Sequence, residues 1–345
     1  MNYTRRDFLS TLGLASAGLG MATLIPSTLQ AKTTASAAPF TFEISLAEFS
    51  YASELYTNKM TNFDFPQRAV NDHGISVLEW VSGFFNNKHT DTAYMKELKS
   101  MCDDLGAKSH LIMVDGENLA AVDAAKRQHA VESHYPWVDA AKFLGCTSIR
   151  VNLGDAMSAM TGKGEEASAP DAAKAAVDGY GKLLEYAGKA GLNVIVENHF
   201  GHSSNPEWLV GIMKQLGAKN KGLLPDFGNF CMERTKAESM DFKALMATKC
   251  LKEYDKYKGV EMMMPYSKGV SAKTHKFAAG GEDPETDFHK IFGIIKASGW
   301  TGGYVGIEYE GGLLRDFGGD TSYLSNDDGI KATKVLLEKV REELK

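Results

Sequence analysis

The chain has 345 residues, of which 43% are hydrophobic and 24% are charged, and its formal net charge is −6. This composition supplies enough apolar side chains for one large folded domain or two small ones. Proteins that bind nucleic acids need clustered Lys and Arg to neutralise phosphates, so the net negative charge argues against a nucleic-acid partner.

Residues 1–38 predict an export signal followed by a small-residue linker. Arg5 and Arg6 lie in TRRDFL, which has the pattern of a twin-arginine motif, and a mildly apolar run extends from Leu9 to Ile25. Small residues then offer cleavage sites for a signal peptidase. We therefore expect a periplasmic protein that is exported already folded, with no stable membrane insertion after signal removal. The alternative is an N-terminal helix that anchors the chain in a membrane.

After residue 38, short apolar runs alternate with longer amphipathic stretches. The predicted strands are Phe42–Ala47, Ile75–Glu79, His110–Val114, Ser148–Asn152, Val194–Glu197, Gly222–Asp226, Gly269–Lys273 and Tyr304–Glu308. Each interval between strand ends has room for one strand and one helix. Eight such units favour a single (β/α)8 TIM barrel over residues 39–345 rather than an open doubly wound sheet. No GxGxxG or Walker loop follows an early strand, which also argues against an open nucleotide-binding sheet.

The intervening segments carry helix signals. In His134–Leu144 the apolar side chains fall on one face, and Gly145 is a typical stop signal. Asp171–Ala190 repeats this pattern before Gly191. Asn205-Pro206-Glu207 has a capping residue followed by Pro in the first turn, which predicts the start of another helix.

Several predicted strands change from apolar to polar at their carboxyl ends. Because alternate side chains of a strand face opposite sides, the polar residues of one parity should face the barrel interior. This inward set contains Arg150, Asn152, Glu197, His199, Ser271, Lys273, His275, Glu308 and Glu310. The carboxyl ends of barrel strands share one mouth, which is the active site of barrel enzymes.

Glu197, Asp226 and Glu308 should therefore converge from three strands. Carboxylates in one partly desolvated mouth repel one another, so a cation must lie nearby. Lys273 and Arg150 could supply it, or a divalent metal could. Oxygen ligands suit Mn²⁺ or Mg²⁺, with Zn²⁺ or Fe²⁺ also possible.

Four segments, VIVENH, LLPDFGNF, GVSAKTHKF and GYVGIEYEG, resemble strands five to eight of the xylose isomerase-like TIM barrels, the sugar phosphate isomerase/epimerase group. The resemblance covers nearly all of residues 39–345, including HYPWVDAAKFLGCTSIRVN. It implies a metal held by Glu197, Asp226 and Glu308. It also implies that Glu197 and Glu308 move protons on opposite faces of a sugar.

The sequence departs from the family pattern at two positions. The family usually has His two residues before the Lys of the seventh strand, where this chain has Ser271 before Lys273. His275 has the same parity and is either the fourth metal ligand or a substrate contact. The family's Asp-x-x-His appears here as Asp226-x-x-Asn229.

Other polar residues near the mouth are candidates for binding substrate. They are Lys273, His199, Asn229, Arg150, Asn152 and His134, the last of which could equally be a helix-start residue. Glu79 and the aromatic residues Trp80, Phe84 and Phe85 are either part of the site or ordinary packing. We expect His110 to be structural, and His73, His89, His129, His202 and His289 to lie at the surface. We expect the four cysteines to be mostly buried and free.

The predicted activity is that of a sugar isomerase or epimerase. A divalent metal would bind adjacent oxygens of a small-molecule sugar and stabilise the enediolate formed when an α-proton leaves. One Glu would remove the proton and the other would return it. The alternatives are a lyase or hydratase acting on a keto-sugar with the same residues, or a periplasmic sugar-binding protein without catalysis. Endonuclease action at abasic DNA sites is disfavoured by the charge.

Overall fold

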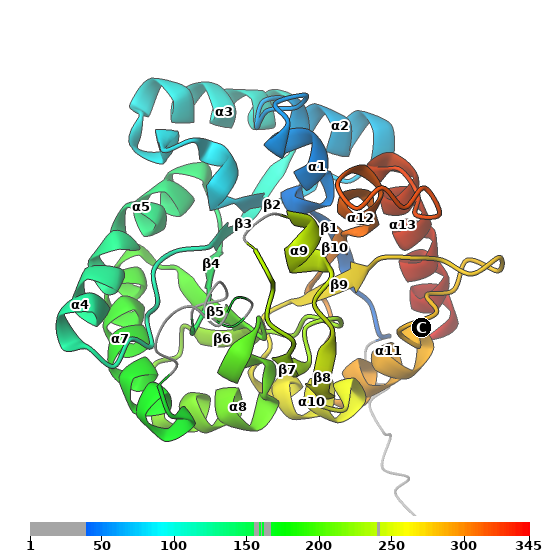
Figure 1. The fold of residues 1–345 in the computed structure, drawn as a ribbon. Helices are drawn as coiled ribbons and strands as arrows, with labels where there is room; N and C mark the ends of the chain where they lie inside the picture. Colours follow the sequence, from blue (N-terminus) through cyan, green and yellow to red (C-terminus); the bar gives the residue numbers. More distant parts are fainter. Residues whose placement is uncertain (1–38, 155–158, 160, 162–166, 240–241) are drawn as a thin grey trace, which may run out of the picture. The chain divides into compact units, whose positions relative to one another are not determined.

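The computed structural model describes residues 39–154, 159, 161, 167–239 and 242–345, and Pro39–Lys345 form one compact unit (Figure 1). The predicted export signal lies outside the described residues. Among the described residues, no helix has both the length and the apolar character that a membrane crossing requires.

Eight parallel strands form a nearly closed barrel (Figure 1). They are β1 (Glu43–Ala47), β2 (Val77–Val81), β3 (Lys108–Val114), β4 (Ser148–Val151), β5 (Asn193–Glu197), β6 (Lys221–Leu224), β9 (Val270–Thr274) and β10 (Tyr304–Tyr309). Their order is β6-β5-β4-β3-β2-β1-β10-β9. Isolated parallel bridges from Leu223 to Ser267 and from Asp226 to Ser271 join the two ends of the sheet. The predicted (β/α)8 barrel is confirmed.

Helices cover the outside of the barrel (Figure 1). They are α1 (Ala52–Tyr56), α2 (Asp64–His73), α3 (Thr92–Asp104), α4 (Ala124–Ser133), α5 (Tyr135–Leu144), α7 (Ala169–Ala190), α8 (Pro206–Gln215), α10 (Lys256–Met263), α11 (Phe288–Ala297), α12 (Gly311–Asp316) and α13 (Asn326–Glu343). Gly191 ends α7 with a φ of 79°, a conformation that suits glycine. Asn205 caps α8 by accepting a hydrogen bond from the backbone N of Glu207.

The strand side chains form two layers, as the alternation predicts. Ile149 and Val151 of β4 and Val194 and Val196 of β5 are fully buried in the hydrophobic core. Tyr180 of α7 is also buried there, and its hydroxyl donates to the backbone O of Val194 at 2.7 Å. Burying each such aliphatic side chain stabilises the fold by about 1.5–3 kcal/mol.

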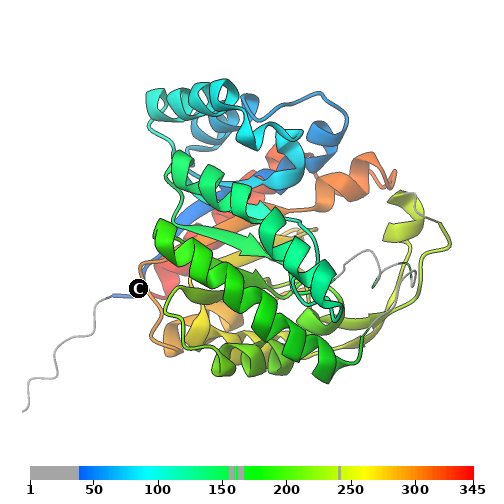
Figure 2. The same ribbon diagram turned by 90° about the vertical axis from the view of Figure 1, so that its left-hand side faces the viewer.

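A hairpin extends from the barrel after β6. Strand β7 (Cys231–Arg234) pairs antiparallel with β8 (Cys250–Glu253), and α9 (Phe242–Met246) lies between them in the sequence. We call residues 231–253 the arm. Figures 1 and 2 place α9 on the side of the barrel where the strands have their carboxyl ends.

A disulfide joins Cys231 to Cys250 across the arm, with a Cα–Cα distance of 5.7 Å. The expectation of free cysteines is therefore wrong for this pair, because the antiparallel pairing of β7 with β8 brings the two residues together. Cys102 and Cys146 are free and buried, as expected.

The structure also decides the positions of His73 and of two aromatic residues that follow or belong to β2. His73 is only 5% exposed, because its Nε2 lies 2.7 Å from the Tyr51 hydroxyl and 3.1 Å from Asp327 Oδ1, so its predicted surface position is wrong. Trp80 and Phe85 are fully buried in the core, which favours the packing alternative for them.

Candidate active site

Three buried carboxylates meet at the carboxyl ends of β5, β6 and β10. Glu197 is the last residue of β5, Asp226 follows β6, and Glu308 lies in β10. These residues are 1%, 0% and 5% exposed, and one carboxylate oxygen of each lies within 4.8 Å of the other two. We call them the mouth carboxylates. Like charges this close in a desolvated place need a cation or protons.

Lys273 of β9 supplies one positive charge to the mouth carboxylates. Its Nζ lies 3.6 Å from Asp226 Oδ2 and 3.6 Å from Glu308 Oε2, and it donates to Glu310 Oε1 at 2.7 Å. Burial lowers the pKa of Lys273, but the carboxylates raise it by more, to well above its ordinary value. Lys273 is therefore an ammonium ion throughout the physiological pH range.

Arg150 of β4 supplies the second positive charge. Its Nε lies 2.8 Å from Glu197 Oε2, and its Nη1 donates to Asp115 Oδ1 at 2.6 Å. Asn152 Nδ2 donates to the same oxygen of Asp115 at 3.0 Å. Sequence reasoning missed Asp115, although this carboxylate follows the apolar third strand directly, as Glu197 ends the fifth.

Burial dominates the protonation of two mouth carboxylates. Burial raises the pKa of Glu197 to about 7, and the nearby Arg150 offsets only part of that shift. Burial also raises the pKa of Glu308 well above its ordinary range, against the opposing effect of Lys273. Glu197 can therefore accept or release a proton near neutral pH, and Glu308 holds its proton more tightly than an ordinary glutamate.

Neutral side chains orient the mouth carboxylates. Asn229 Nδ2 donates to Glu197 Oε1 at 3.0 Å, and Ser271 Oγ donates to Glu308 Oε2 at 2.8 Å. Asn198, fully buried, accepts from the backbone N of Asp226 at 2.7 Å and donates to the backbone O of Asp226 at 3.0 Å. Sequence reasoning did not identify Asn198, because its parity points away from the predicted inward set.

His275 lies outside the group of mouth carboxylates. Its Nδ1 lies 3.2 Å from Glu285 Oε2, and its Nε2 lies 3.4 Å from Glu310 Oε2. Burial lowers the pKa of His275, but these two carboxylates raise it by more, to about 9. A protonated imidazole has no free lone pair for a metal, so in this arrangement His275 forms ion pairs with Glu310 and Glu285 instead.

Two other histidines, His199 and His134, are neutral or enclosed. Burial, together with the nearby Arg150, lowers the pKa of His199 to about 3, so the ring is neutral. Its Nδ1 is buried without a hydrogen-bond partner. His134 is only 1% exposed, and its Nδ1 donates to the backbone O of Ala130 at 2.6 Å. Its ring packs so closely on Gly116 that a Cβ there would lie 2.7 Å from it. The structure thus encloses His134.

Glu79 of β2 lies in the barrel interior. It is 3% exposed, and its Oε1 accepts from Ser45 Oγ at 2.6 Å. Its carboxylate also lies against Gly306, where a Cβ would come within 2.6 Å of Oε2. Glu79 is not one of the mouth carboxylates, and burial raises its pKa to about 7.

The mouth carboxylates fit a divalent cation. Within the described part of the chain they are the only group of three such side chains whose ligand atoms lie this close together. Asp226 Oδ2 is buried and accepts no hydrogen bond, which leaves a lone pair for a metal. Three hard oxygen donors suit Mg²⁺ or Mn²⁺ better than softer metals.

The structure is thus a (β/α)8 barrel whose buried carboxylates Glu197, Asp226 and Glu308 meet at one mouth. The family model "Xylose isomerase-like TIM barrel" matches residues 67–332, and the chain belongs to this family. No curated protein matches the sequence.

Solved structures of sugar epimerases share the fold. D-allulose 3-epimerase from Methylomonas sp. in complex with D-allulose has a TM-score of 0.62 and 12% identity, covering 88% of this chain and 98% of that one. L-ribulose 3-epimerase has a TM-score of 0.61 and 16% identity, covering 88% and 96%. A xylose isomerase-like TIM barrel protein from Mycobacterium smegmatis in complex with magnesium has a TM-score of 0.61 and 14% identity, covering 88% and 98%. At these identities the likeness shows the fold alone.

Proposed function

We propose that this protein is a sugar isomerase or epimerase that transfers a proton at a carbon next to a carbonyl, with Glu197 and Glu308 as the acid–base pair. The observation that carries the proposal is the meeting of these two buried carboxylates from β5 and β10 in one group with Asp226. The sugar epimerases among the similar structures support this reaction class.

The two carboxylates are oriented and tuned for proton transfer. Asn229 holds Oε1 of Glu197, and Ser271 holds Oε2 of Glu308. Burial raises the pKa of both carboxyl groups, so one can remove the α-proton as a base while the other returns a proton as an acid. Lys273 stabilises the negative charge that develops on the substrate oxygens, because its ammonium lies among these carboxylates.

We further propose that Glu197, Asp226 and Glu308 hold a divalent metal, Mg²⁺ or Mn²⁺. A bound metal of this kind would polarise the carbonyl of the sugar as a Lewis acid. Asp226 Oδ2, which accepts no hydrogen bond, supports the assignment, as does the magnesium complex of the similar barrel from Mycobacterium smegmatis.

We also propose that the protein works in the periplasm. Disulfides form and persist in oxidising compartments, so the bond between Cys231 and Cys250 supports export. Fusing residues 1–38 to a reporter should send it to the periplasm, and replacing Arg5 and Arg6 together with Lys should stop that export. Normal export of the double variant would contradict the proposal.

Solvent-exchange measurements test the proposed reaction. Metal-loaded protein is incubated in D₂O with neutral keto- and aldo-sugars, and deuterium at the α-carbon is followed by NMR. We expect incorporation with the wild type and none when Glu197 and Glu308 are both replaced with Gln. The matched control is Glu79→Gln, which changes a buried carboxylate of the same barrel outside the mouth and should retain exchange. Exchange that persists in the double variant would refute the acid–base pair.

A further inference from the structure

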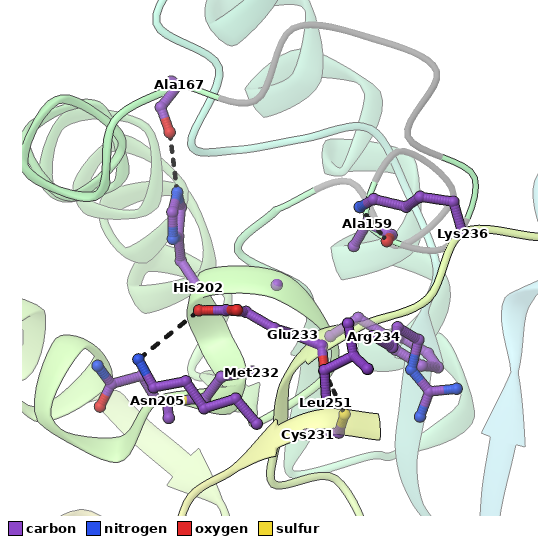
Figure 3. A pocket seen from close by; sticks show the side chains of 13 residues that line it. Ala159, Ala167, His202, Asn205, Cys231, Met232, Glu233, Arg234, Lys236 and Leu251 are labelled. Atoms are coloured by element: carbon purple, nitrogen blue, oxygen red, sulfur yellow. Dashed lines mark hydrogen bonds and ion pairs between the residues drawn. The ribbon is translucent and has the colours of Figure 1, made fainter. Parts of the chain in front are cut away.

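A cavity of about 580 Å³ lies between the arm and the segment that follows β5. Figure 3 shows His202 and Asn205 on one side of it and Arg234 and Lys236 on the other. Its wall also includes Phe200, three residues after Glu197. Three residues of extended chain span at most about 11 Å, so the cavity begins within reach of a sugar derivative bound at the mouth.

Arg234 has hydrogen-bond donors in this cavity that a ligand could use. Its guanidinium stacks over the Phe200 ring, 5.5 Å from the centroid, and its Nη1 donates to Thr248 Oγ1 at 2.7 Å. Its Nε is buried and has no hydrogen-bond partner, and no ion pair joins Arg234 to a carboxylate of the described residues. A guanidinium has five donor hydrogens, so most of this group's capacity is unused.

The pKa values of two arginines show the same contrast. Burial lowers the pKa of Arg234, and no carboxylate in the described part of the chain offsets that effect. Burial also acts on Arg150, but Asp115 and Glu197 raise its pKa by more. As far as the described residues go, the Arg234 site therefore lacks the negative charge that the Arg150 site contains.

The wall of the cavity carries more positive than negative side chains. Among the described residues, Arg234, Lys236 and Lys252 line it together with a single carboxylate, Glu233. Glu233 lies 3.6 Å from Lys252 Nζ, and both side chains are largely exposed. Lys236 Nζ donates to the backbone O of Ala159 at 2.9 Å. In a protein of net charge −6, this local excess favours an anionic ligand.

The backbone at Phe200 holds the aromatic ring in this wall at a conformational cost. Its φ is 58°, in the left-handed region that bulky residues rarely adopt. Such strain persists only where surrounding structure over-determines it, and it is concentrated at functional sites. Here it accompanies the stacking of Phe200 beneath Arg234.

We propose that this cavity is a subsite for the carboxylate of an acidic sugar, such as a uronic or aldonic acid, whose reacting carbons lie at the mouth carboxylates. The inference rests on the proposed function and specifies its substrate class. A planar guanidinium forms paired hydrogen bonds with a carboxylate, and the buried Nε with an Nη would provide the two donors. A phosphate ester is the competing source of negative charge.

Binding calorimetry on the full-length protein tests the subsite with four probes: D-glucuronate, D-gluconate, D-glucose and D-glucose 6-phosphate. We expect the wild type to bind at least one of the two sugar acids more tightly than glucose. Arg234→Gln should weaken that binding about ten- to a hundredfold and leave glucose unaffected. Arg341→Gln is the matched control, because Arg341 also stacks on a Phe ring, Phe42 at 5.4 Å, and donates one hydrogen bond to the backbone, but lies outside the cavity.

The other outcomes would overturn the subsite. They are equal affinity of the wild type for the sugar acids and glucose, an equal loss in the Arg341 variant, or Arg234-dependent binding of glucose 6-phosphate alone. Arg234→Lys keeps the positive charge but loses the paired donors of the guanidinium, so it should bind the sugar acid more tightly than Arg234→Gln and less tightly than the wild type. Melting curves should confirm that both Arg234 variants fold. Replacing both Glu197 and Glu308 with Gln should abolish solvent exchange yet keep the preference for the sugar acid, so failure of the subsite and failure of the proposed reaction give different results.

Discussion

Two charged clusters in the molecule differ in how their charges are paired. The first is the group of mouth carboxylates with Lys273 and Arg150. The second lies where α1, α2 and α13 meet and consists of Tyr51, Glu54, Arg68, His73 and Asp327; we call it the Arg68 cluster. Arg68 forms ion pairs with Glu54 and Asp327 there, and its guanidinium also covers the Tyr51 ring at 4.3 Å. At the mouth, by contrast, Asp226 Oδ2 has no hydrogen-bond partner, and Lys273 Nζ lies 3.6 Å from it.

The pKa shifts of the carboxyl groups show what this difference means. Burial raises the pKa of Asp327, but Arg68, Tyr51 and His73 lower it by more, so it lies below its ordinary value. Burial raises the pKa of Glu197 to about 7, despite Arg150. The native state therefore favours the ionised form at the Arg68 cluster and the protonated form at the mouth. A paired cluster stabilises the fold, whereas an under-paired one costs stability and is typical of functional sites.

The largest expected effect on stability comes from removing the mouth ammonium. Lys273→Met should lower the free energy of unfolding by about 3–5 kcal/mol in chelator at pH 7, because it leaves buried carboxylates without this cation. Added Mg²⁺ or Mn²⁺ should restore much of the loss. Lys108→Met is the control, since Lys108 Nζ donates to the Tyr304 hydroxyl on an exposed surface and its loss should cost little. Indifference of the Lys273 variant to metal in urea titrations would contradict a metal site.

Breaking the Arg68 cluster should give a somewhat smaller effect that metal does not reverse. Arg68→Met leaves Glu54 and Asp327 unpaired, but these carboxylates are partly exposed, so we expect a loss of about 2–3 kcal/mol. Urea titration with and without Mg²⁺ measures it, and turnover of the folded variant should be unchanged. A stability loss that Mg²⁺ repaired would mean that the two clusters are not independent.

The pH dependence of stability should have opposite signs at the two clusters. Glu197 favours the protonated form when folded, so its contribution is present below pH 4.5 and is lost as pH rises through about 7. In metal-free buffer, Glu197→Gln should therefore gain on the order of 1–3 kcal/mol relative to wild type between pH 5 and pH 8. Asp327 favours the ionised form, so its contribution is present above pH 3.8 and is lost as pH falls. Asp327→Asn should differ most from wild type near neutral pH, and parallel profiles for both variants would contradict the comparison.

A smaller effect is expected from the hydrogen bond that orients Glu308. Ser271→Ala removes the donor to Glu308 Oε2, which is worth about 1.5–3 kcal/mol for an ionised acceptor and about 1 kcal/mol for a protonated one. Turnover should fall about five- to tenfold, and the protein should remain folded. Ser271→Thr keeps the hydroxyl and should retain activity; an equal loss in both variants would indicate a packing effect instead.

Local patterns carry most of the fold and part of the candidate site. The period of two along the strands placed Arg150, Lys273 and Glu308 on the inward side, because side-chain direction in a strand is set by the backbone. Strand ends were less predictable: β6 ends at Leu224, and Asp226 joins the sheet only through an isolated bridge to Ser271. That pairing depends on a distant segment of the chain.

Contacts between residues that are far apart in the sequence could not be predicted from the local sequence pattern. His73 is buried because Asp327, 254 residues away, and Tyr51 contact its ring. The pairing of Cys231 with Cys250 depends on the register of the arm, which no spacing rule specifies. The position of His275 beside Glu285 likewise follows from the loop after β9.

The most direct test of the central claim compares solvent exchange and net conversion in Glu197→Gln and Glu308→Gln. General acid–base groups contribute about 10²–10⁴-fold in rate, so each variant should lose at least a hundredfold in turnover. Exchange at the α-carbon should survive in only one of them, because only one carboxylate removes the first proton. Near wild-type turnover in both variants, on a substrate that the wild type converts, would contradict the account.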